Sequence, residues 1–97
     1  MRIAIVCAAV LAAAPLAVSA QNAGSRLAAS CAMCHGTAGH SVGGNEPLAG
    51  MPKDELMRKF KEFRSGTKPA TAMHQISKGY SDSEVEQIAA YFAAQKK

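Results

Sequence analysis

Apolar residues recur at helical spacing near the C-terminal end of the chain. Ser81 and Glu84 precede this stripe and form a capping-box pattern, in which each side chain accepts a hydrogen bond from the backbone N–H of the other. Tyr80, just before the cap, is placed to pack on the first apolar residue of the helix. The stripe consists of Val85, Ile88, Ala89 and Phe92. The pattern predicts an amphipathic helix that begins after Ser81 and buries one face.

A second helix is indicated between Pro52 and Gly66. Pro52 suits a helix start, and Gly66 suits a helix end. Leu56, Phe60 and Phe63 recur between them at helical spacing. Residues 65–69 then form a predicted turn, and residues 70–78 read either as a short helix or as an irregular segment that ends at Gly79.

A further helix, near Ser25, is expected to carry Cys31. Ser25 is the predicted N-cap, and Gly24 and Ala28, four residues apart, are small enough for another helix to cross closely. Residues 36–50 contain five glycines and no apolar periodicity, which predicts an ordered loop. No segment shows a strand alternation, so the pattern predicts an all-α fold.

The N-terminus has the pattern of a cleaved signal peptide. Arg2 precedes an uncharged apolar run, and Val18 and Ala20 are the small residues expected before a cut after Ala20. Cleavage would remove residues 1–20, which include Cys7, and residues 21–97 would remain as a domain of 77 residues. The alternative is a retained membrane anchor, because residues 3–20 nearly suffice to span a bilayer. After cleavage we expect no stable membrane insertion.

The net charge is mildly positive, +4 for the whole chain and +3 once Arg2 is removed. No arginine-rich stripe interleaved with aromatic residues is present, so we expect an acidic protein partner and no nucleic acid. The predicted second helix carries the densest basic group, which is either a solvated face paired with Glu55 and Glu62 or a docking surface for an acidic redox partner. This group consists of Lys53, Arg58, Lys59, Lys61 and Arg64.

The segment Cys31-Ala32-Met33-Cys34-His35 carries the clearest chemistry. Two cysteines three apart on one helix can form thioethers with the vinyl groups of a haem, and the adjacent His35 can then bind the iron. A domain of 77 residues also has little core of its own, and a buried porphyrin would add apolar surface. Two other interpretations are a Cys31–Cys34 disulfide and a zinc site. The zinc site would use Cys31, Cys34, His35 and His40, although its adjacent Cys34 and His35 would strain a tetrahedron.

The iron of a haem bound by His35 either binds a second side chain on the other face of the ring or keeps its sixth coordination position open. Met73 is the best candidate, because the 38 residues after His35 give the chain length enough to pass around the ring edge. His74 beside it would point elsewhere. The other candidates fit less well, either through their closeness to His35 or through expected packing in the core. These are Met33, Met51, Met57 and His40. A backbone carbonyl of the 36–50 loop would accept the free N–H of His35.

The mature sequence resembles the short bacterial class I cytochromes c from residue 28 to residue 92. The likeness rests on Ala28-Ala29-Ser30-Cys31-Ala32-Met33-Cys34-His35-Gly36, on Pro47-Leu48-Ala49-Gly50 and on Met73-His74-Gln75-Ile76-Ser77-Lys78-Gly79-Tyr80-Ser81-Asp82. The resemblance implies three to four helices around one covalently bound haem c. It also implies Met73 as an axial iron ligand and the carbonyl of Pro47 as the acceptor of the His35 N–H.

Within that family the chain is most similar to the cytochrome subunit of flavocytochrome c sulfide dehydrogenase. The similarity lies in Ser41-Val42-Gly43, the corner at residues 48–51 and the run from Ile76 to Ser81. It implies a periplasmic haem subunit that accepts electrons from a flavoprotein. A free carrier between a periplasmic dehydrogenase and a terminal oxidase is the alternative. In either role the chain alone turns over no substrate, so we expect no catalytic residue.

Overall fold

The computed structural model describes residues 23–97, so the expected signal peptide and its cleavage point lie outside the described residues. An N-terminal helical segment occupies residues 23–35. It consists of a helix over residues 23–28, a 3₁₀ turn at Ala29–Cys31 and helix α2 at Ala32–His35. After a second 3₁₀ turn at Thr37–Gly39 come helices α3 (Lys53–Ser65), α4 (Ala72–Ser77) and α5 (Asp82–Ala93). Residues 23–97 contain no strand, which confirms the all-α prediction.

Helix α5 forms as its cap and apolar stripe predict. The Ser81 hydroxyl accepts from the backbone N–H of Glu84 at 3.1 Å, and the Glu84 carboxylate accepts from the backbone N–H of Ser81 at 2.9 Å. Val85, Ile88, Ala89 and Phe92 are all buried and form half of the hydrophobic core. The local hydrogen bonds thus set where the helix begins, and burial of the stripe supplies its stability.

Helix α3 begins and ends where the sequence indicates. Pro52 is its N-cap, and Gly66 adopts the left-handed conformation at φ 82°, a conformation that suits glycine at a helix end. Leu56 and Phe60 are buried against α5. Met51, just before the helix, is also a core residue, as the sequence analysis expects.

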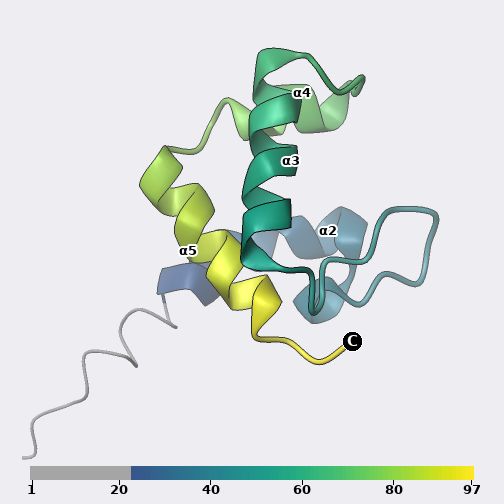
Figure 1. Cartoon of the computed structure of the whole chain (residues 1–97). Coiled ribbons are helices and arrows are strands. Elements are labelled where there is room, and N and C mark those ends of the chain that lie inside the picture. The colour runs from purple at the N-terminus through teal and green to yellow at the C-terminus, as the bar shows by residue number, and fades with distance from the viewer. Residues whose placement is uncertain (1–22) are drawn as a thin grey trace, which may run out of the picture.

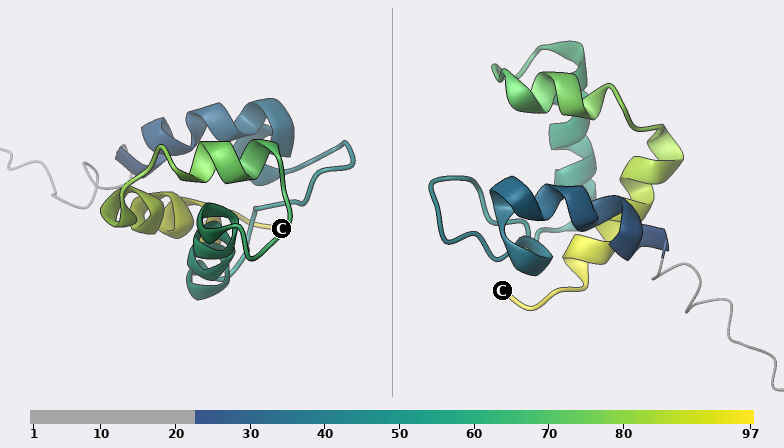
Figure 2. Two further views of the ribbon diagram at one scale, coloured as in Figure 1. Left: turned by 90° about the horizontal axis from the view of Figure 1, so that it is seen from above. Right: turned by 180° about the vertical axis from the view of Figure 1, so that it is seen from behind.

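The short segment after α3 is helical rather than irregular. His74 of α4 hydrogen-bonds through Nδ1 to the carbonyl oxygen of Phe63 at 2.7 Å, and Ser77 is fully buried. These contacts hold α4 against the C-terminal half of α3 (Figure 1). Seen from above and from behind, α4 and the N-terminal helical segment lie on the same side of α3 (Figure 2). No helix within residues 23–97 is long and apolar enough to cross a membrane.

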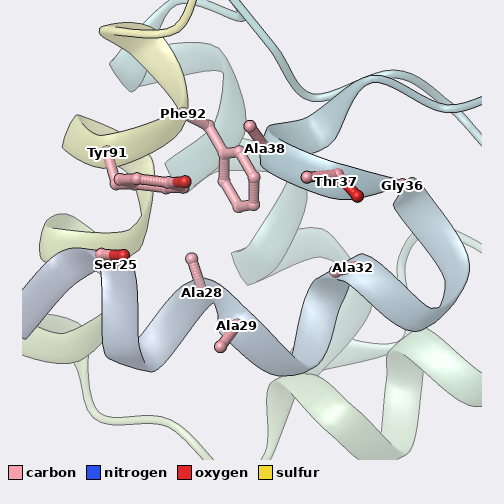
Figure 3. Close-up of a pocket in the computed structure, with 9 residues that line it drawn as sticks. All are labelled: Ser25, Ala28, Ala29, Ala32, Gly36, Thr37, Ala38, Tyr91 and Phe92. Atoms are coloured by element: carbon pink, nitrogen blue, oxygen red, sulfur yellow. The ribbon is translucent and has the colours of Figure 1, made fainter.

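The N-terminal helical segment crosses α5 at Gly24, as its small residues predict. A Cβ atom at Gly24 would lie 2.8 Å from the backbone oxygen of Gln87 and 3.3 Å from the Cβ of Tyr91. Ala28 is buried and points toward Phe92 (Figure 3). The predicted N-cap at Ser25 is wrong, because the chain is already helical at residue 23 and Ser25 lies inside the helix. The helix begins before Ser25, and Gly24 in its first turn packs against α5.

We expect Gly24→Ala to destabilise the protein although alanine is the better helix former. Alanine gains about 1 kcal/mol in helix propensity, but the clash with a backbone oxygen must push α5 away, at a cost of about 1–3 kcal/mol. Urea unfolding of the purified protein measures the balance. Gly43→Ala is the matched control, because a Cβ there meets no atom within 4 Å. Equal stabilities of the two variants would contradict the close helix crossing.

Candidate cofactor site

Cys31 and Cys34 lie on successive turns of the N-terminal helical segment. Cys31 is half-buried against the core, and Cys34 is exposed. Burial raises the pKa of the Cys31 thiol above its ordinary value, although a hydrogen bond with Ser30 partly opposes this. Neither sulfur is joined to the other in a disulfide. Both thiols are therefore present as free groups on one helix, which is the arrangement that two thioether bonds to one porphyrin need.

The imidazole of His35 is oriented by the loop that follows it. Its Nδ1 lies 2.7 Å from the backbone carbonyl oxygen of Glu46, so Nδ1 carries the proton and donates it to that oxygen. The other ring nitrogen, Nε2, is then the one with a free electron pair. A histidine held in this way is typical of metal ligands, whose second nitrogen is fixed by a carbonyl or a carboxylate.

The acceptor of this hydrogen bond differs from the expectation based on the resemblance. It is the carbonyl of Glu46, one residue before Pro47. Two side-chain contacts hold this part of the loop. The amide of Asn45 donates to the carbonyl of Cys34 at 2.8 Å, and the Glu46 carboxylate is ion-paired with Lys59 of α3. The first contact holds residue 45 on the N-terminal helical segment, and the second holds residue 46 on α3.

Met73 lies in α4 and is half-buried against the core. Its neighbour His74 points to the carbonyl of Phe63, as a bystander would, and holds α4 on α3. Met73 thus stands on an element that lies on the same side of α3 as the segment carrying His35 (Figure 2). A thioether, an imidazole with one fixed nitrogen and two free thiols form a donor set that fits covalently bound haem.

The other sequence candidates are hydrogen-bonded elsewhere, exposed or packed in the core. The two ring nitrogens of His40 lie within hydrogen-bonding distance of the carbonyl oxygens of Thr37 and Lys96. Met33 is 91% exposed, whereas Met51 is buried in the core. Within the part of the chain that the structure describes, no three His, Cys, Asp or Glu side chains are grouped as metal ligands, so the cysteines and histidines of the zinc interpretation are not brought together.

Arg64 forms a clamp that the sequence analysis did not identify. Its guanidinium donates to the carbonyl of Ser77 at 3.3 Å, to the carbonyl of Tyr80 at 3.0 Å and to the carboxylate of Asp82 at 2.7 Å. It therefore fixes the connection from α4 to α5 on α3. The only sequence signal is one more basic residue on an amphipathic helix, which does not reveal which carbonyls it reaches.

We expect the clamp to give acid-dependent stability. Hydrogen bonding to Arg64 lowers the pKa of Asp82, so this contribution is present above the ordinary carboxyl pKa of about 3.9 and is lost as the pH falls through the lowered value. Asp82→Asn should lower the free energy of unfolding at pH 7, and its difference from wild type should vanish at an acidic pH below the lowered pKa.

Urea unfolding at the two pH values tests this expectation. Asp54→Asn is the matched control, since Asp54 also stands in the first turn of a helix but outside the clamp. It removes the same favourable interaction with a helix N-terminus. If Asp82→Asn lowers the free energy of unfolding at pH 7 no more than Asp54→Asn does, the clamp does not contribute to stability.

The basic face of α3 is largely paired, which favours the solvated-face interpretation. Lys53 pairs with Glu86, Arg58 with Glu62, Lys59 with Glu46 and Glu55, and Arg64 with Asp82. Lys61 is exposed. Most of these charges are therefore neutralised within the chain and offer little to an acidic partner.

A cavity of about 240 Å³ lies elsewhere, between the N-terminal helical segment and the end of α5 (Figure 3). Small residues form most of its wall, together with Tyr91 and Phe92. Cys31, Cys34, His35 and Met73 are not among its lining residues. The cavity is therefore separate from the candidate cofactor residues.

Comparison with known proteins gives consistent matches. A family model described as cytochrome c oxidase, cbb3-type, subunit III matches residues 19–92. Cytochrome c4 of Pseudomonas aeruginosa is 37% identical over 75 residues, which are 76% of this chain and 37% of the relative. The cytochrome subunit of sulfide dehydrogenase of Chlorobaculum tepidum is 33% identical over 72 residues, 74% of this chain and 66% of the relative.

A third relative is the thiosulfate dehydrogenase electron acceptor of Stutzerimonas stutzeri. It is 40% identical over 67 residues, which are 65% of this chain and 31% of the relative. The chain thus spans between about one third and two thirds of the length of these relatives.

Proposed function

The chain belongs to the family of cytochrome c domains described as cbb3-type cytochrome c oxidase subunit III, whose members carry covalently bound haem c, and we propose that it holds one haem and transfers single electrons in the periplasm. Cys31 and Cys34 are proposed as the thioether anchors, and His35 and Met73 as the axial ligands. When bound, the haem iron alternates between the ferric and ferrous states.

The observation that carries this proposal is the pairing of His35 with the loop. The Glu46 carbonyl fixes Nδ1, which leaves Nε2 for iron on the residue that directly follows the second anchoring cysteine. The rest of the chain contributes position. Cys31 and Met73 pack against the apolar core, His74 holds α4 on α3, and Arg64 holds the connection that follows α4.

The partner is proposed from the relatives. One relative is named the cytochrome subunit of a sulfide dehydrogenase, and another the electron acceptor of a thiosulfate dehydrogenase. We propose that this chain likewise accepts electrons from a sulfur-oxidising enzyme, in the form of a flavoprotein subunit that oxidises sulfide. The signal-peptide pattern of residues 1–20 supports export, after which residues 21–97 would act as the cytochrome c domain.

Gentle purification of the tagged protein from its host's periplasm tests these assignments together. We expect a mass that corresponds to a chain beginning at Gln21. We also expect one haem, a flavin bound to a larger chain that is purified with it, and reduction of the haem by sulfide. Haem without flavin or a larger chain would overturn the subunit assignment in favour of a free carrier. An uncleaved chain in the cytoplasm would overturn the assignment to the periplasm.

A further inference from the structure

Glu46 makes two contacts, one through its backbone and one through its side chain. Its backbone carbonyl accepts the Nδ1–H of His35 at 2.7 Å, and its side-chain carboxylate is ion-paired with Lys59. A single residue thereby connects α3 to the imidazole. No pattern in the sequence indicates this link, because the loop has no periodicity and many glycines.

The Lys59 ammonium is held more firmly than a typical surface charge. Its side chain is only 16% exposed, and it also pairs with Glu55, one turn earlier in α3, at 3.4 Å. The hydrogen bond to Glu46 raises the pKa of Lys59, so the charge persists throughout the neutral range. A pair with one partly buried member loses less of its attraction to salt than a fully exposed pair does.

The loop around Glu46 has few other restraints. A Cβ at Gly43 or Gly44 would meet no atom within 4 Å, and Val42 is fully exposed. Asn45 is attached to the N-terminal helical segment through the carbonyl of Cys34, and the loop returns to Gly39 at Leu48. Between these two points, the ion pair with Lys59 is the contact that ties the loop to α3.

We propose that Lys59 is a positioning residue for His35, acting through Glu46 to set the hydrogen bond of the iron-binding imidazole. This inference rests on the proposed role of His35 as the proximal ligand. The ion pairs of Lys59 are with Glu46 and Glu55, so its link to the imidazole runs through Glu46. Its effect is to keep the Glu46 carbonyl within hydrogen-bonding distance of Nδ1.

The proposal and a simple charge effect predict opposite shifts of the reduction potential. A firm N–H···O=C bond increases the electron donation of the imidazole and stabilises ferric iron, so weakening the bond should raise the reduction potential. Removing a positive charge without touching the bond stabilises ferric iron and should lower the potential. The direction of the shift therefore separates the two effects.

The test compares Lys59→Ala with Lys53→Ala in the haem-loaded protein. Lys53 lies in the same helix and is ion-paired, but with Glu86 of α5. We expect Lys59→Ala to raise the potential and to accelerate exchange of the His35 imidazole N–H, followed by NMR in the ferrous state, by about tenfold. Lys53→Ala should lower the potential slightly or leave it unchanged, with exchange as in wild type. Lys59→Arg should restore wild-type values.

Glu46→Gln provides a second route if Lys59→Ala does not fold. It keeps the backbone carbonyl and removes the ion pair, so it should accelerate imidazole exchange to the same extent. Lys59→Ala added to Glu46→Gln should cause no further acceleration. Unchanged exchange in both single variants, or a lowered potential in Lys59→Ala, would overturn the proposal. Whether the wild-type protein carries haem is decided separately by its spectrum, so the two proposals can fail independently.

Discussion

Serine in place of both Cys31 and Cys34 is expected to abolish covalent haem attachment completely. A thioether needs a thiol sulfur to add to each vinyl group, and a hydroxyl does not replace it. The domain would also lose the apolar group that completes its small core, so the purified chain should be largely unfolded. Haem staining after denaturing electrophoresis and far-UV circular dichroism measure the two effects.

The third cysteine supplies the matched control. Cys7 lies in the predicted signal peptide, and Cys7→Ser should leave haem content and helicity unchanged. Each single substitution should leave at most one thioether and a lower yield of haem protein. Full covalent haem in the double variant would contradict the assignment of these cysteines as anchors.

Met73→Ala has the second largest expected effect. A thioether ligand favours ferrous iron, so its removal should lower the reduction potential by on the order of 0.1 V or more, within the roughly 0.8 V that axial ligands span. The vacated position should also bind carbon monoxide in the ferrous protein. Potentiometry and the carbon monoxide difference spectrum measure these changes.

Met33→Ala is the control for Met73→Ala, because Met33 is 91% exposed and should affect neither quantity. A Met73→Ala protein with an unchanged potential and no carbon monoxide binding would show that another group is the sixth ligand. His74 would then be tested next. Its loss should otherwise only loosen α4, since its Nδ1 is committed to the carbonyl of Phe63.

The sequence predicts best those features that local chemistry determines. The capping box at Ser81 and Glu84 fixes the start of α5, and Gly66 ends α3 with the left-handed residue that a helix end favours. The close approach at Gly24 also follows from residue size. Ser25 shows the limit of this reasoning, because a residue that suits a cap can also lie inside a helix when packing extends it.

The features that the sequence did not reveal depend on distant contacts. The acceptor of the His35 N–H is the carbonyl of Glu46 instead of Pro47, and Glu46 is also ion-paired with Lys59, which lies 13 residues away in α3. The three bonds of Arg64 join α3 to the segment after α4 in the same way. Periodicity and spacing report which face is buried, and they carry no information on which backbone carbonyl a charged side chain reaches.

The most direct measurement is the visible absorption spectrum of the protein purified from its host's periplasm, recorded oxidised and reduced, before and after extraction with acidified acetone. We expect haem bands that stay with the protein through the extraction, at one haem per chain. A colourless protein, or haem removed by the solvent, would contradict the central claim that this chain is a covalent haem protein.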